Sequence, residues 1–436
     1  MPTALEYMPD DKEQRAQADK AFEDARALMS RNTNYYDGNH KKHLNDDRDN
    51  VVINLCKIVV DSIIDFLMPK MPAIVVDDDG IVDEVEQYVR AVWHDNGGAN
   101  FLRQLAKIGA LYGHVFVRVW FENDGAVKLY LIRPQNIIVF YDADDYTVLW
   151  YEQRWMVREQ RTKFEYRQDI VRNTDNDFWT INVYKRKNAV GQWEQVRSDD
   201  WLYPIAPIVD WQHLQSIHDY IGDSELKHAK LNDQINSVAS DIKTILRYHA
   251  SPRVVGTGFI ADDVQPTAVD GLWTIPNPDA KVQILQGVAQ LDAAQKFYDT
   301  LVQAFLSESK VVLLPSDIRQ FSNVTNLGIR ATYLPMLSKV EVLRRNYERG
   351  ITRICKLVAL VNLSVDTQFS LMWPDALPTN MIEQLALIER QINLGVMSRQ
   401  TAAELLGLNW PKEQRLIDEE LLNDLSSGFE PSVGML

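Results

Sequence analysis

Two groups of residues near the N-terminus have types and spacings that could bind a metal ion. His40 and His43 are three residues apart and could chelate one ion, although we prefer a solvated basic loop beside Tyr35 and Tyr36. Asp77 to Asp79 resemble a carboxylate cluster. Two-metal sites draw their carboxylates from separate elements, however, whereas adjacent acids usually form a solvated loop.

Catalytic motifs are missing from the rest of the chain. There is no GxxxxGK[ST], GxSxG, HExxH or CxxC pattern, and no Ser/His/Asp group can be assembled without inventing contacts. We therefore predict no catalytic site, no metal site and no cofactor. The main enzymatic alternative is a metal-dependent nuclease that uses Asp77–Asp79 together with Glu84.

The third group is a basic stretch on a helix predicted from about 329 to 363. Such a row of cations can bind DNA phosphates through counterion release. The alternative, which we prefer, is a solvated face paired with acids of a neighbouring element or subunit. The residues concerned are Lys339, Arg344, Arg345, Arg349 and Arg353, with Arg330 and Lys356 at the two ends.

The elements that position these residues belong to a folded, acidic protein. The 436 residues include 61 acids against 46 Lys and Arg, a formal net charge of −15, and 46% are hydrophobic. Proteins that hold nucleic acid through its phosphates are usually basic, so this chain either avoids nucleic acid or touches it without holding on. The two cysteines, Cys56 and Cys355, are too few for a disulfide framework and fit a reducing compartment.

No segment has the pattern of a signal peptide or a membrane span. The most apolar run, Leu55 to Leu67, is interrupted by Lys57, Asp61 and Asp65, which share one face of a helix. We expect a soluble amphipathic helix whose other face buries Leu55, Val59, Ile63 and Phe66.

Hydrophobic periodicity divides the chain into helical and β-rich parts. Residues 1 to about 110 are predicted helical with polar breaks, including a helix at 81–95. From Tyr112 the period changes from 3.6 to 2, and Asn123-Asp124-Gly125 predicts a hairpin turn. Further strands are expected at 137–141, 147–156, 178–187 and 193–197, so the β-rich part ends near Trp211.

Two helices with matched apolar stripes, 222–249 and 288–309, enclose a segment rich in Gly and Pro. Its short apolar runs at 253–255, 272–275 and 282–285 predict a small β unit at the tip of a projecting arm. The alternative is a helical hairpin in the core of a monomer. The residues expected to pack the two helices are Leu231, Ile235, Val238, Ile242, Leu291, Tyr298, Leu301 and Phe305.

Beyond a polar loop at 320–328, the chain is predicted helical again. The helix at 329–363 would be roughly 50 Å long at the usual rise per residue. Shorter helices are expected at about 380–394 and 398–406, separated by Gly395.

Three ordered blocks of residues resemble the phage portal proteins of the SPP1-like type. The first runs from Asn54 through Asp61 to Pro72, and the second from Leu105 to the Ile132-Arg-Pro134 turn. The third joins Gly222-Asp-Ser-Glu-Leu226 to Asn232-Asp-Gln-Ile-Asn236 and Ser240-Asp241. The resemblance covers about residues 35 to 410. It rests on the order of the blocks, since none of them is specific by itself.

The resemblance implies a mixed α+β, mainly helical subunit of a dodecameric ring. It assigns 1–221 to a helical and β-rich wing, 222–249 and 288–319 to two stem helices, and 250–287 to a small β-containing clip. It assigns 320–328 to a tunnel loop at the narrowest point of a channel and 329–377 to a long wing helix and its connection. Residues 378–425 would form crown helices, and 426–436 a disordered tail.

The implied function is passive and mechanical. The ring would lie at one capsid vertex of a virion, assembled in the bacterial cytoplasm, and would surround double-stranded DNA during packaging and ejection without reading its sequence. The clip would dock the terminase and later the head–tail connector proteins. Major capsid and scaffolding proteins are further implied partners, and no membrane is involved. Besides the nuclease, a helical scaffold without a channel stays open as an alternative.

Charge in the implied channel is expected to let DNA slide, because a strongly basic bore would trap it. The acids of the clip outnumber its bases. These acids are Asp262, Asp263, Asp270 and Asp279. The tunnel loop is uncharged and consists of Ser322, Asn323, Val324, Thr325, Asn326 and Leu327. We predict that Val324 and Leu327 form a neutral collar that touches DNA, the alternative being that they pack against a neighbouring subunit.

Overall fold

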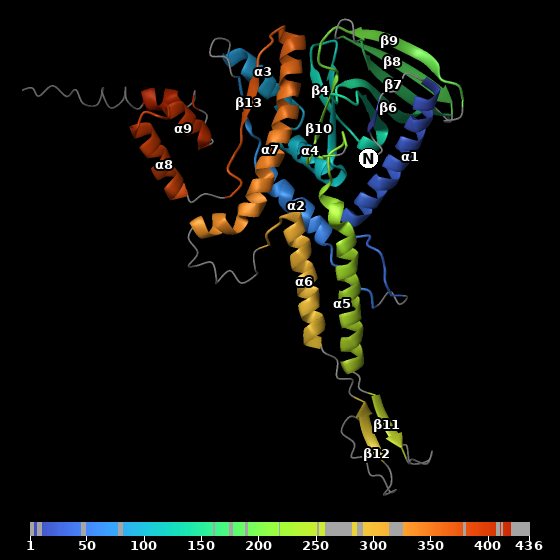
Figure 1. Ribbon diagram of the computed structural model, residues 1–436. Coiled ribbons are helices and arrows are strands. Elements are labelled where there is room, and N and C mark those ends of the chain that lie inside the picture. The colour runs from blue at the N-terminus through green and yellow to red at the C-terminus, as the bar shows by residue number, and fades with distance from the viewer. Residues whose placement is uncertain are drawn as a thin grey trace, which may run out of the picture. The chain divides into compact units, whose positions relative to one another are not determined.

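The computed structural model describes residues 4–6, 11–44, 49–76, 82–159, 162–173, 178–187, 191–217, 219–250, 253–257, 281–285, 291–313, 326–377, 381–406, 410 and 413–419. The chain forms two units, Met1–Ala376 and Leu377–Leu436. Helices predominate, and the strands lie in the first unit (Figure 1). The predicted fold class, mixed and mainly helical, is confirmed.

The helices of the first unit follow the predicted order along the chain. They are α1 (Asp11–Asp37), α2 (Leu55–Leu67), α3 (Val82–Asp95), α4 (Gly98–Tyr112), α5 (Ala229–Ala250), α6 (Leu291–Ser309) and α7 (Asn326–Leu363). Two short 3₁₀ helices, η1 (Pro134–Asn136) and η2 (Glu225–His228), precede β5 and α5 respectively.

Helix α2 is amphipathic as predicted. Its first turn is capped by Asn54, whose side chain accepts a hydrogen bond from the Lys57 backbone N–H at 2.9 Å. Lys57 also forms an ion pair with Asp61 at 2.7 Å, one helical turn later. The opposite face is apolar, and Leu55, Val59 and Ile63 are buried on it.

Six strands of the described residues form one sheet in the order β1-β5-β6-β7-β8-β9. The strands are β1 (Ala4–Glu6), β5 (Ile137–Tyr141), β6 (Val148–Glu159), β7 (Thr162–Arg172), β8 (Trp179–Lys187) and β9 (Glu194–Trp201). Neighbouring strands pair antiparallel, except that β1 pairs parallel with β5. Helix α1 covers one face, where Ala21 and Phe22 pack with Phe140 and Trp150, whose rings stack at 4.1 Å.

Strand β7 is missing from the sequence-based prediction because its inward face is charged rather than apolar. Arg167 lies beside Asp169 on that face, at 3.2 Å, and both are buried. Glu165 is buried as well and bonds to Arg186 of β8 at 2.6 Å. The hydrophobic alternation that identifies the other strands is therefore absent from β7.

Three smaller sheets complete the strands of the described residues. β10 (Ile208–Gln212), β3 (His114–Phe121) and β4 (Val127–Ile132) form one sheet, and β3 and β4 are joined by the predicted turn at Asn123-Asp124-Gly125. Gly125 has a φ of +86°, the conformation that favours glycine in such turns. β2 (Ala73–Val76) pairs with β13 (Phe369–Met372), and β11 (Arg253–Thr257) with β12 (Lys281–Leu285).

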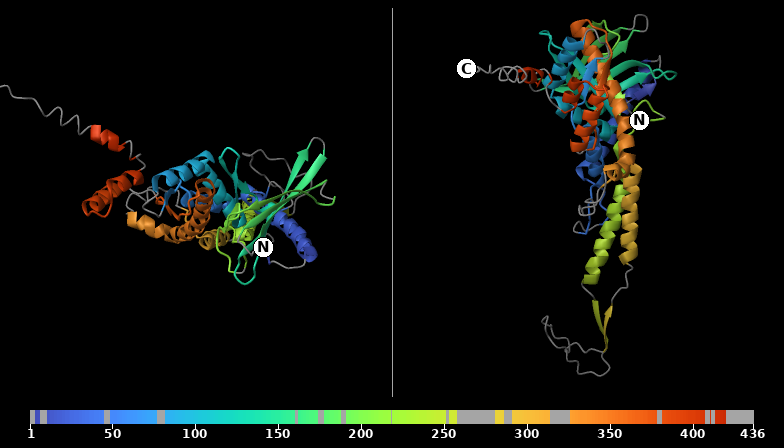
Figure 2. Two further views of the ribbon diagram at one scale, coloured as in Figure 1. Left: turned by 90° about the horizontal axis from the view of Figure 1, so that it is seen from above. Right: turned by 90° about the vertical axis from the view of Figure 1, so that its left-hand side faces the viewer.

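Helices α5 and α6 lie side by side in both views, and the β11–β12 hairpin falls between them in the chain (Figures 1 and 2). We call α5 and α6 the helix pair. The predicted helices at 222–249 and 288–309 are thereby confirmed in outline, although Glu225 to His228 are 3₁₀ helix. The predicted apolar run at 272–275 lies outside the described residues.

Helix α7 begins earlier than predicted and contains a proline. Asn326, Leu327 and Gly328 form its first turn, so their assignment to a loop is wrong. Gly328 is predicted to lie in a loop, but the helix continues through it. The Thr332 hydroxyl donates a hydrogen bond to the Gly328 carbonyl at 2.9 Å. Pro335 lies inside the helix, and α7 bends in this part (Figure 1).

The second unit contains α8 (Met381–Asn393) and α9 (Arg399–Leu405), close to the helices predicted there. Gly395 separates them with a φ of +70°. The tail predicted to be disordered, 426–436, lies outside the described residues. Among the helices of the described residues, none is sufficiently long and apolar to cross a membrane.

Candidate functional site

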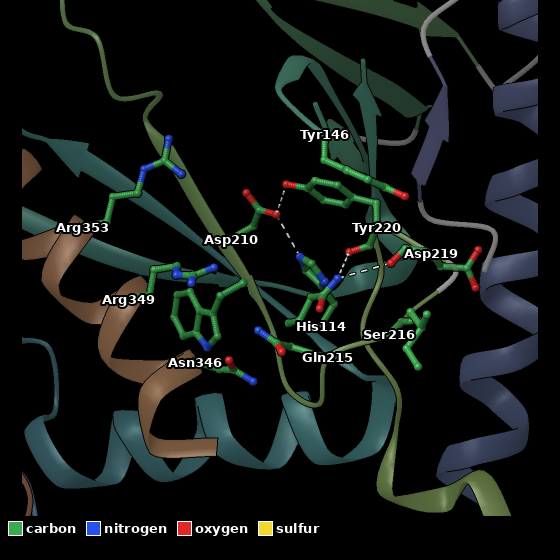
Figure 3. Close-up of a pocket in the computed structure, with 13 residues that line it drawn as sticks. His114, Tyr146, Asp210, Gln215, Ser216, Asp219, Tyr220, Asn346, Arg349 and Arg353 are labelled. Carbon is green, nitrogen blue, oxygen red and sulfur yellow. Dashed lines mark hydrogen bonds and ion pairs between the residues drawn. The ribbon is translucent and has the colours of Figure 1, made fainter. Parts of the chain in front are cut away.

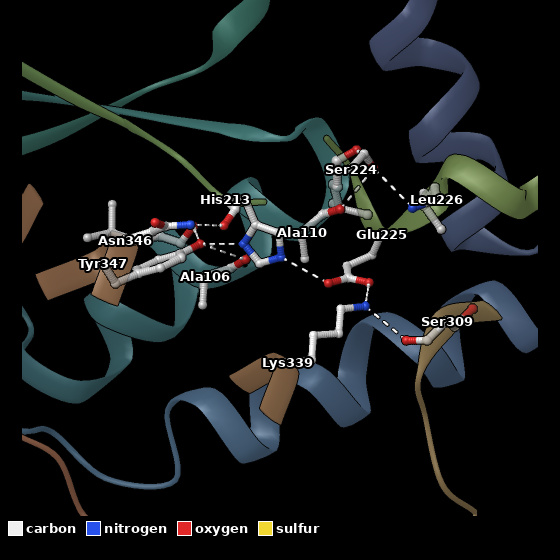
Figure 4. Close-up of polar contacts among 12 residues, drawn as sticks. Ala106, Ala110, His213, Ser224, Glu225, Leu226, Ser309, Lys339, Asn346 and Tyr347 are labelled. Atoms are coloured by element: carbon white, nitrogen blue, oxygen red, sulfur yellow. Dashed lines mark hydrogen bonds and ion pairs between the residues drawn. The ribbon is translucent and has the colours of Figure 1, made fainter. Parts of the chain in front are cut away.

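A buried polar network connects both helices of the pair to α7 (Figure 4). Its centre is Glu225, in η2 just before α5. The Lys339 ammonium of α7 donates to the Glu225 carboxylate and, at 2.9 Å, to the backbone carbonyl of Ser309 at the end of α6. We call the set Glu225, His213, Lys339 and Tyr347, with the Ser309 carbonyl, the anchor network.

His213, just after β10, extends the anchor network to a second position on α7. Its Nε2 lies 3.2 Å from a carboxylate oxygen of Glu225, and its Nδ1 lies 2.9 Å from the hydroxyl of Tyr347. Burial lowers the pKa of His213 more than the contact with Glu225 raises it, so the imidazole is neutral at pH 7. The neutral ring donates from Nε2 to Glu225 and accepts at Nδ1 from Tyr347.

The charges of the anchor network balance within it. Burial raises the pKa of Glu225, but the Lys339 ammonium and the His213 imidazole lower it more, so the carboxylate is ionised. Burial raises the pKa of Tyr347 well above its ordinary value, which keeps its hydroxyl protonated. At neutral pH Glu225 is therefore ionised, whereas His213 and Tyr347 are uncharged. The arrangement therefore acts as a structural anchor rather than as a proton-transfer site.

Close backbone contacts hold Glu225 in place, and they explain the block Gly222-Asp-Ser-Glu-Leu226. The Ser224 hydroxyl accepts from the Leu226 N–H at 3.0 Å and bonds to the carbonyl of Leu111 at 2.7 Å. Gly113 has a φ of +83°, and a Cβ there would lie 2.1 Å from the carbonyl oxygen of Gly222. These two glycines let the end of α4 meet the segment before η2.

The block Asn232 to Ser240 forms a row of polar contacts along α5. The Asn232 amide accepts from the Cys56 N–H at 3.1 Å and donates to the Ile53 carbonyl at 2.8 Å. One turn further, Asn236 accepts from the Ile53 N–H at 2.9 Å, and Ser240 accepts from the N–H of Val51 at 2.9 Å. The three side chains are buried, so α5 holds the extended segment that leads into α2.

The apolar stripes of the helix pair are only partly covered in one chain. Ile235 and Phe305 are buried, and the other predicted packing residues are half-buried: Leu231, Val238, Ile242, Leu291, Tyr298 and Leu301. Leu246 and Phe297 are exposed to 46% and 55%. The contacts of α5 and α6 with each other and with the segment before α2 leave part of the stripes uncovered, so apolar surface remains for a further partner.

The predicted basic face of α7 divides into two parts. Lys339 and Arg344 are buried, so the expectation of a solvated face is wrong for them. Lys339 belongs to the anchor network, and Arg344 donates to the Pro374 carbonyl at 2.7 Å and lies over the Trp373 ring. Pairing with acids of another element is confirmed for Lys339. Arg345, Arg349 and Arg353 are exposed, as is Arg330, which forms an ion pair with Asp375.

A polar cavity of about 400 Å³, which we call the α7 cavity, lies where β10 faces α7 (Figure 3). Asp210 of β10 is buried beside it and accepts hydrogen bonds from three side chains. Tyr151 donates at 2.6 Å, Tyr220 at 2.7 Å and His114, through Nε2, at 2.8 Å. Burial raises the pKa of Asp210, but the three donors lower it more, so the carboxylate is ionised.

The residues predicted to face DNA fall mostly outside the described residues. This holds for Ser322, Asn323, Val324 and Thr325, and for the clip acids Asp262, Asp263, Asp270 and Asp279. Asn326 and Leu327 lie in the first turn of α7.

The metal-site alternatives gain no support from the described residues. Within them, no three His, Cys, Asp or Glu side chains are grouped to hold a metal ion. Asp77–Asp79 lie outside the described residues, and Glu84 is exposed on α3. We expected His40 to lie in a solvated loop, and this prediction is wrong for His40. It is buried edge-on against the Tyr35 ring, with Nδ1 at 3.6 Å from Asp233.

Sequence reasoning did not identify His213, Tyr347 or Asp210. His213 lies between a strand and a loop with no motif around it, and Tyr347 reads as one more apolar residue of a long stripe. Glu225 lay in a block that the resemblance had singled out, although nothing local assigned it a partner.

Comparisons with known proteins found one matching family model and several solved structures of similar fold. The family model described as phage portal protein, SPP1 Gp6-like, matches residues 19–421. A chain of the solved virion of a native gene transfer agent particle is 14% identical, with a TM-score of 0.50 over 88% of this chain and 94% of that chain. A chain of the neck of an empty gene transfer agent particle, computed with C6 symmetry, is 15% identical, with a TM-score of 0.48 over 81% and 90%. No curated protein sequence matches.

Proposed function

Because the chain belongs to the SPP1 Gp6-like family of phage portal proteins, we propose that it is one subunit of a ring-shaped channel for double-stranded DNA. The ring lies at one vertex of a capsid, and DNA passes through it during packaging and ejection. The part played by the chain is mechanical and needs no catalytic group.

The observation that carries the proposal is the incompletely covered helix pair. The apolar stripes of the two helices are half-buried within one chain. The anchor network joins α7 to Glu225, just before α5, and to Ser309, at the end of α6. A second copy placed alongside would cover the remaining apolar surface, and each further copy would do the same. A closed ring is the arrangement in which no copy is left with an uncovered face.

The width of the helices supports a ring of twelve. Packed helices lie about 10 Å apart, so an inner layer of twelve has a circumference of about 120 Å and a radius of about 19 Å. Subtracting the half-thickness of a helix leaves a bore of about 28 Å, wider than the roughly 20 Å of B-form DNA. A ring of six would leave about 9 Å and exclude the duplex.

The acidic composition suits a conduit better than a tight DNA-binding protein. A net charge of −15 argues against strong phosphate binding, since counterion release would hold the DNA in place. In this proposal Val324 and Leu327 contribute to the neutral collar around the duplex. Replacing Val324 by Arg is expected to slow packaging in an in vitro assay with purified motor. An unchanged packaging rate contradicts the collar.

The remaining assignments extend the same proposal to the parts of the subunit. The helix pair is the stem, residues 250–287 the clip that docks the terminase and later the connector proteins, and 320–325 the tunnel loop, since 326–328 belong to α7. The N-terminal helices, the β-rich part and α7 form the wing, and residues 378–425 the crown. The assembled ring joins major capsid and scaffolding proteins, in the cytoplasm of a bacterial host.

The test is the assembly state of the purified full chain. Native mass measurement and two-dimensional electron-microscopy averages are expected to show a closed ring with an open centre. A lone monomer, or an assembly with a filled centre, contradicts the proposal. The scaffold alternative predicts the second of these outcomes.

A pair of variants links the ring to the helix pair. Phe297→Ser removes an apolar side chain that is 55% exposed in the single chain, so the monomer should stay folded while assembly weakens. The control is Lys296→Ser, at the neighbouring exposed position of α6. Equal assembly by both variants would mean that copies meet through another surface.

A further inference from the structure

Two guanidinium groups line the α7 cavity. Arg349 and Arg353 project from α7 along one side of it, opposite Tyr146 and Tyr220 (Figure 3). Both guanidinium groups are exposed, and neither has an ion-pair partner in the described part of the chain. Two unpaired cations one helical turn apart are unusual in a chain with a net charge of −15.

The carboxylate beside the cavity does not neutralise these cations. Asp210 already accepts from Tyr151, Tyr220 and His114, which use both of its oxygens. The positive charge of Arg353 reaches the cluster nonetheless, because it lowers the pKa of Tyr151 and Tyr220 against the larger effect of burial. Asp219 also lines the cavity, so two carboxylates match the two guanidinium groups in number, but the N–H donors of Arg349 and Arg353 are available to bind an anion.

A buried donor without a partner lies at the same place. The indole Nε1 of Trp211 is buried and has no hydrogen-bond partner among the described residues, and Trp211 lines the cavity. Buried polar groups are normally satisfied, so such a donor next to a cavity points to a ligand that completes it. Indole and guanidinium groups only donate, so that ligand is an acceptor, and an anion suits the two guanidinium groups.

We propose that the α7 cavity receives the carboxylate of an Asp or Glu side chain from a second copy of this chain. Arg349 and Arg353 bind the carboxylate in this arrangement, and guanidinium groups suit it because they can donate two parallel hydrogen bonds. The inference rests on the proposed ring, which brings copies side by side.

The rim of the cavity indicates a protein ligand rather than DNA. Ile217, on the loop that lines the cavity, is 90% exposed, and Tyr146 is 51% exposed. An exposed apolar and aromatic rim around paired cations fits an acidic side chain flanked by apolar neighbours. The phosphate groups of DNA offer no apolar surface to Ile217. The acid-rich chain itself, with 61 Asp and Glu, supplies many such partners.

The first test compares assembly of two variants of the full chain. Arg349→Gln with Arg353→Gln should raise the protein concentration at half-maximal ring formation about tenfold or more, because charge pairs at interfaces contribute strongly to affinity. The control, Arg345→Gln, changes an exposed cation one turn earlier on α7 that does not line the cavity, and should assemble like the wild type. Equal assembly of all three proteins overturns the inference.

The second test identifies the ligand directly. A photo-reactive benzoylphenylalanine placed at position 217 is irradiated in rings mixed from isotopically light and heavy chains, with and without duplex DNA. Light–heavy crosslinks to a peptide that contains Asp or Glu support the inference, and crosslinks to DNA or within one chain overturn it. If the wild-type chain forms no ring, the proposed function fails. If rings form but the variants and crosslinks disagree with the prediction, only the inference fails.

Discussion

Replacing Lys339 by Met removes the ammonium that holds the anchor network together. Met keeps most of the side-chain volume, so the change leaves the packing and deletes the charge. Glu225 then stays buried with only the neutral His213 beside it, and the Ser309 carbonyl loses its donor. Breaking one side of a buried ion pair typically costs about 3–5 kcal/mol, because the remaining charge has no compensation. We expect this loss in the free energy of unfolding.

The loss depends on pH with a defined sign. In the wild type the net pKa of Glu225 is lowered, so its contribution is present above the unfolded pKa of about 4.3 and is lost as the pH falls through the folded pKa. In the variant, burial prevails and the pKa of Glu225 is raised. Its carboxyl then stays protonated in the folded state, and stability falls as the pH rises above about 4.3. The difference between the two proteins is therefore larger at pH 8 than at pH 5.

The assay is denaturant unfolding followed by tryptophan fluorescence at equal protein concentration. Glu225→Gln in the Lys339→Met background should recover much of the loss, because it removes the uncompensated charge. The control, Lys356→Met, breaks an ion pair with Asp366 on the same helix whose side chains are 26% and 66% exposed, and should cost about 1 kcal/mol or less. A Lys339→Met variant within about 1 kcal/mol of the wild type, or a loss that Glu225→Gln deepens, refutes the reasoning.

Three further outcomes are expected. Gly109→Ala should destabilise the fold, although alanine favours helices, because its Cβ would lie 2.1 Å from a buried tyrosine hydroxyl; a thermal melt unchanged from wild type contradicts this. Asn236→Ala should cost about 1–3 kcal/mol by leaving a backbone N–H without its acceptor, whereas the exposed Gln234→Ala should be near neutral in the same unfolding assay. Burial raises the pKa of Cys56 and of Cys355 to about 12, so both thiols should react with a colorimetric disulfide reagent only after unfolding, and rapid reaction of the native protein would be the opposite result.

The sequence predicted the elements well where hydrophobic period and turn residues agreed. The strand expected at 137–141 is β5, and the turn at Asn123-Asp124-Gly125 joins β3 to β4. Prediction failed where other interactions replaced apolar alternation. β7 was missed because Glu165 and Arg167 fill inward positions as ion pairs, and the first turn of α7 was missed because Gly328 was taken as a loop residue.

The candidate site was less accessible to sequence reasoning. Glu225 and Lys339 were both singled out, one in a block and the other in a basic row, but 114 residues separate them and no local pattern pairs them. The cavity depends on Asp210, which looks like an ordinary polar residue of a strand. Contacts of this kind follow from tertiary packing, which periodicity does not report.

Pro335 divides α7 into two arms that meet at a bend. A proline has no N–H to donate to the carbonyl four residues earlier, so the two arms of the helix are joined by a weakened turn. Tyr333, buried against Phe66, forms the pivot. The long arm is fixed by Lys339, whereas the short arm is tethered at Arg330 by an exposed ion pair with Asp375 that contributes about 1 kcal/mol or less. The short arm therefore relies on a weaker ion pair than the long arm, which the buried ammonium holds in place.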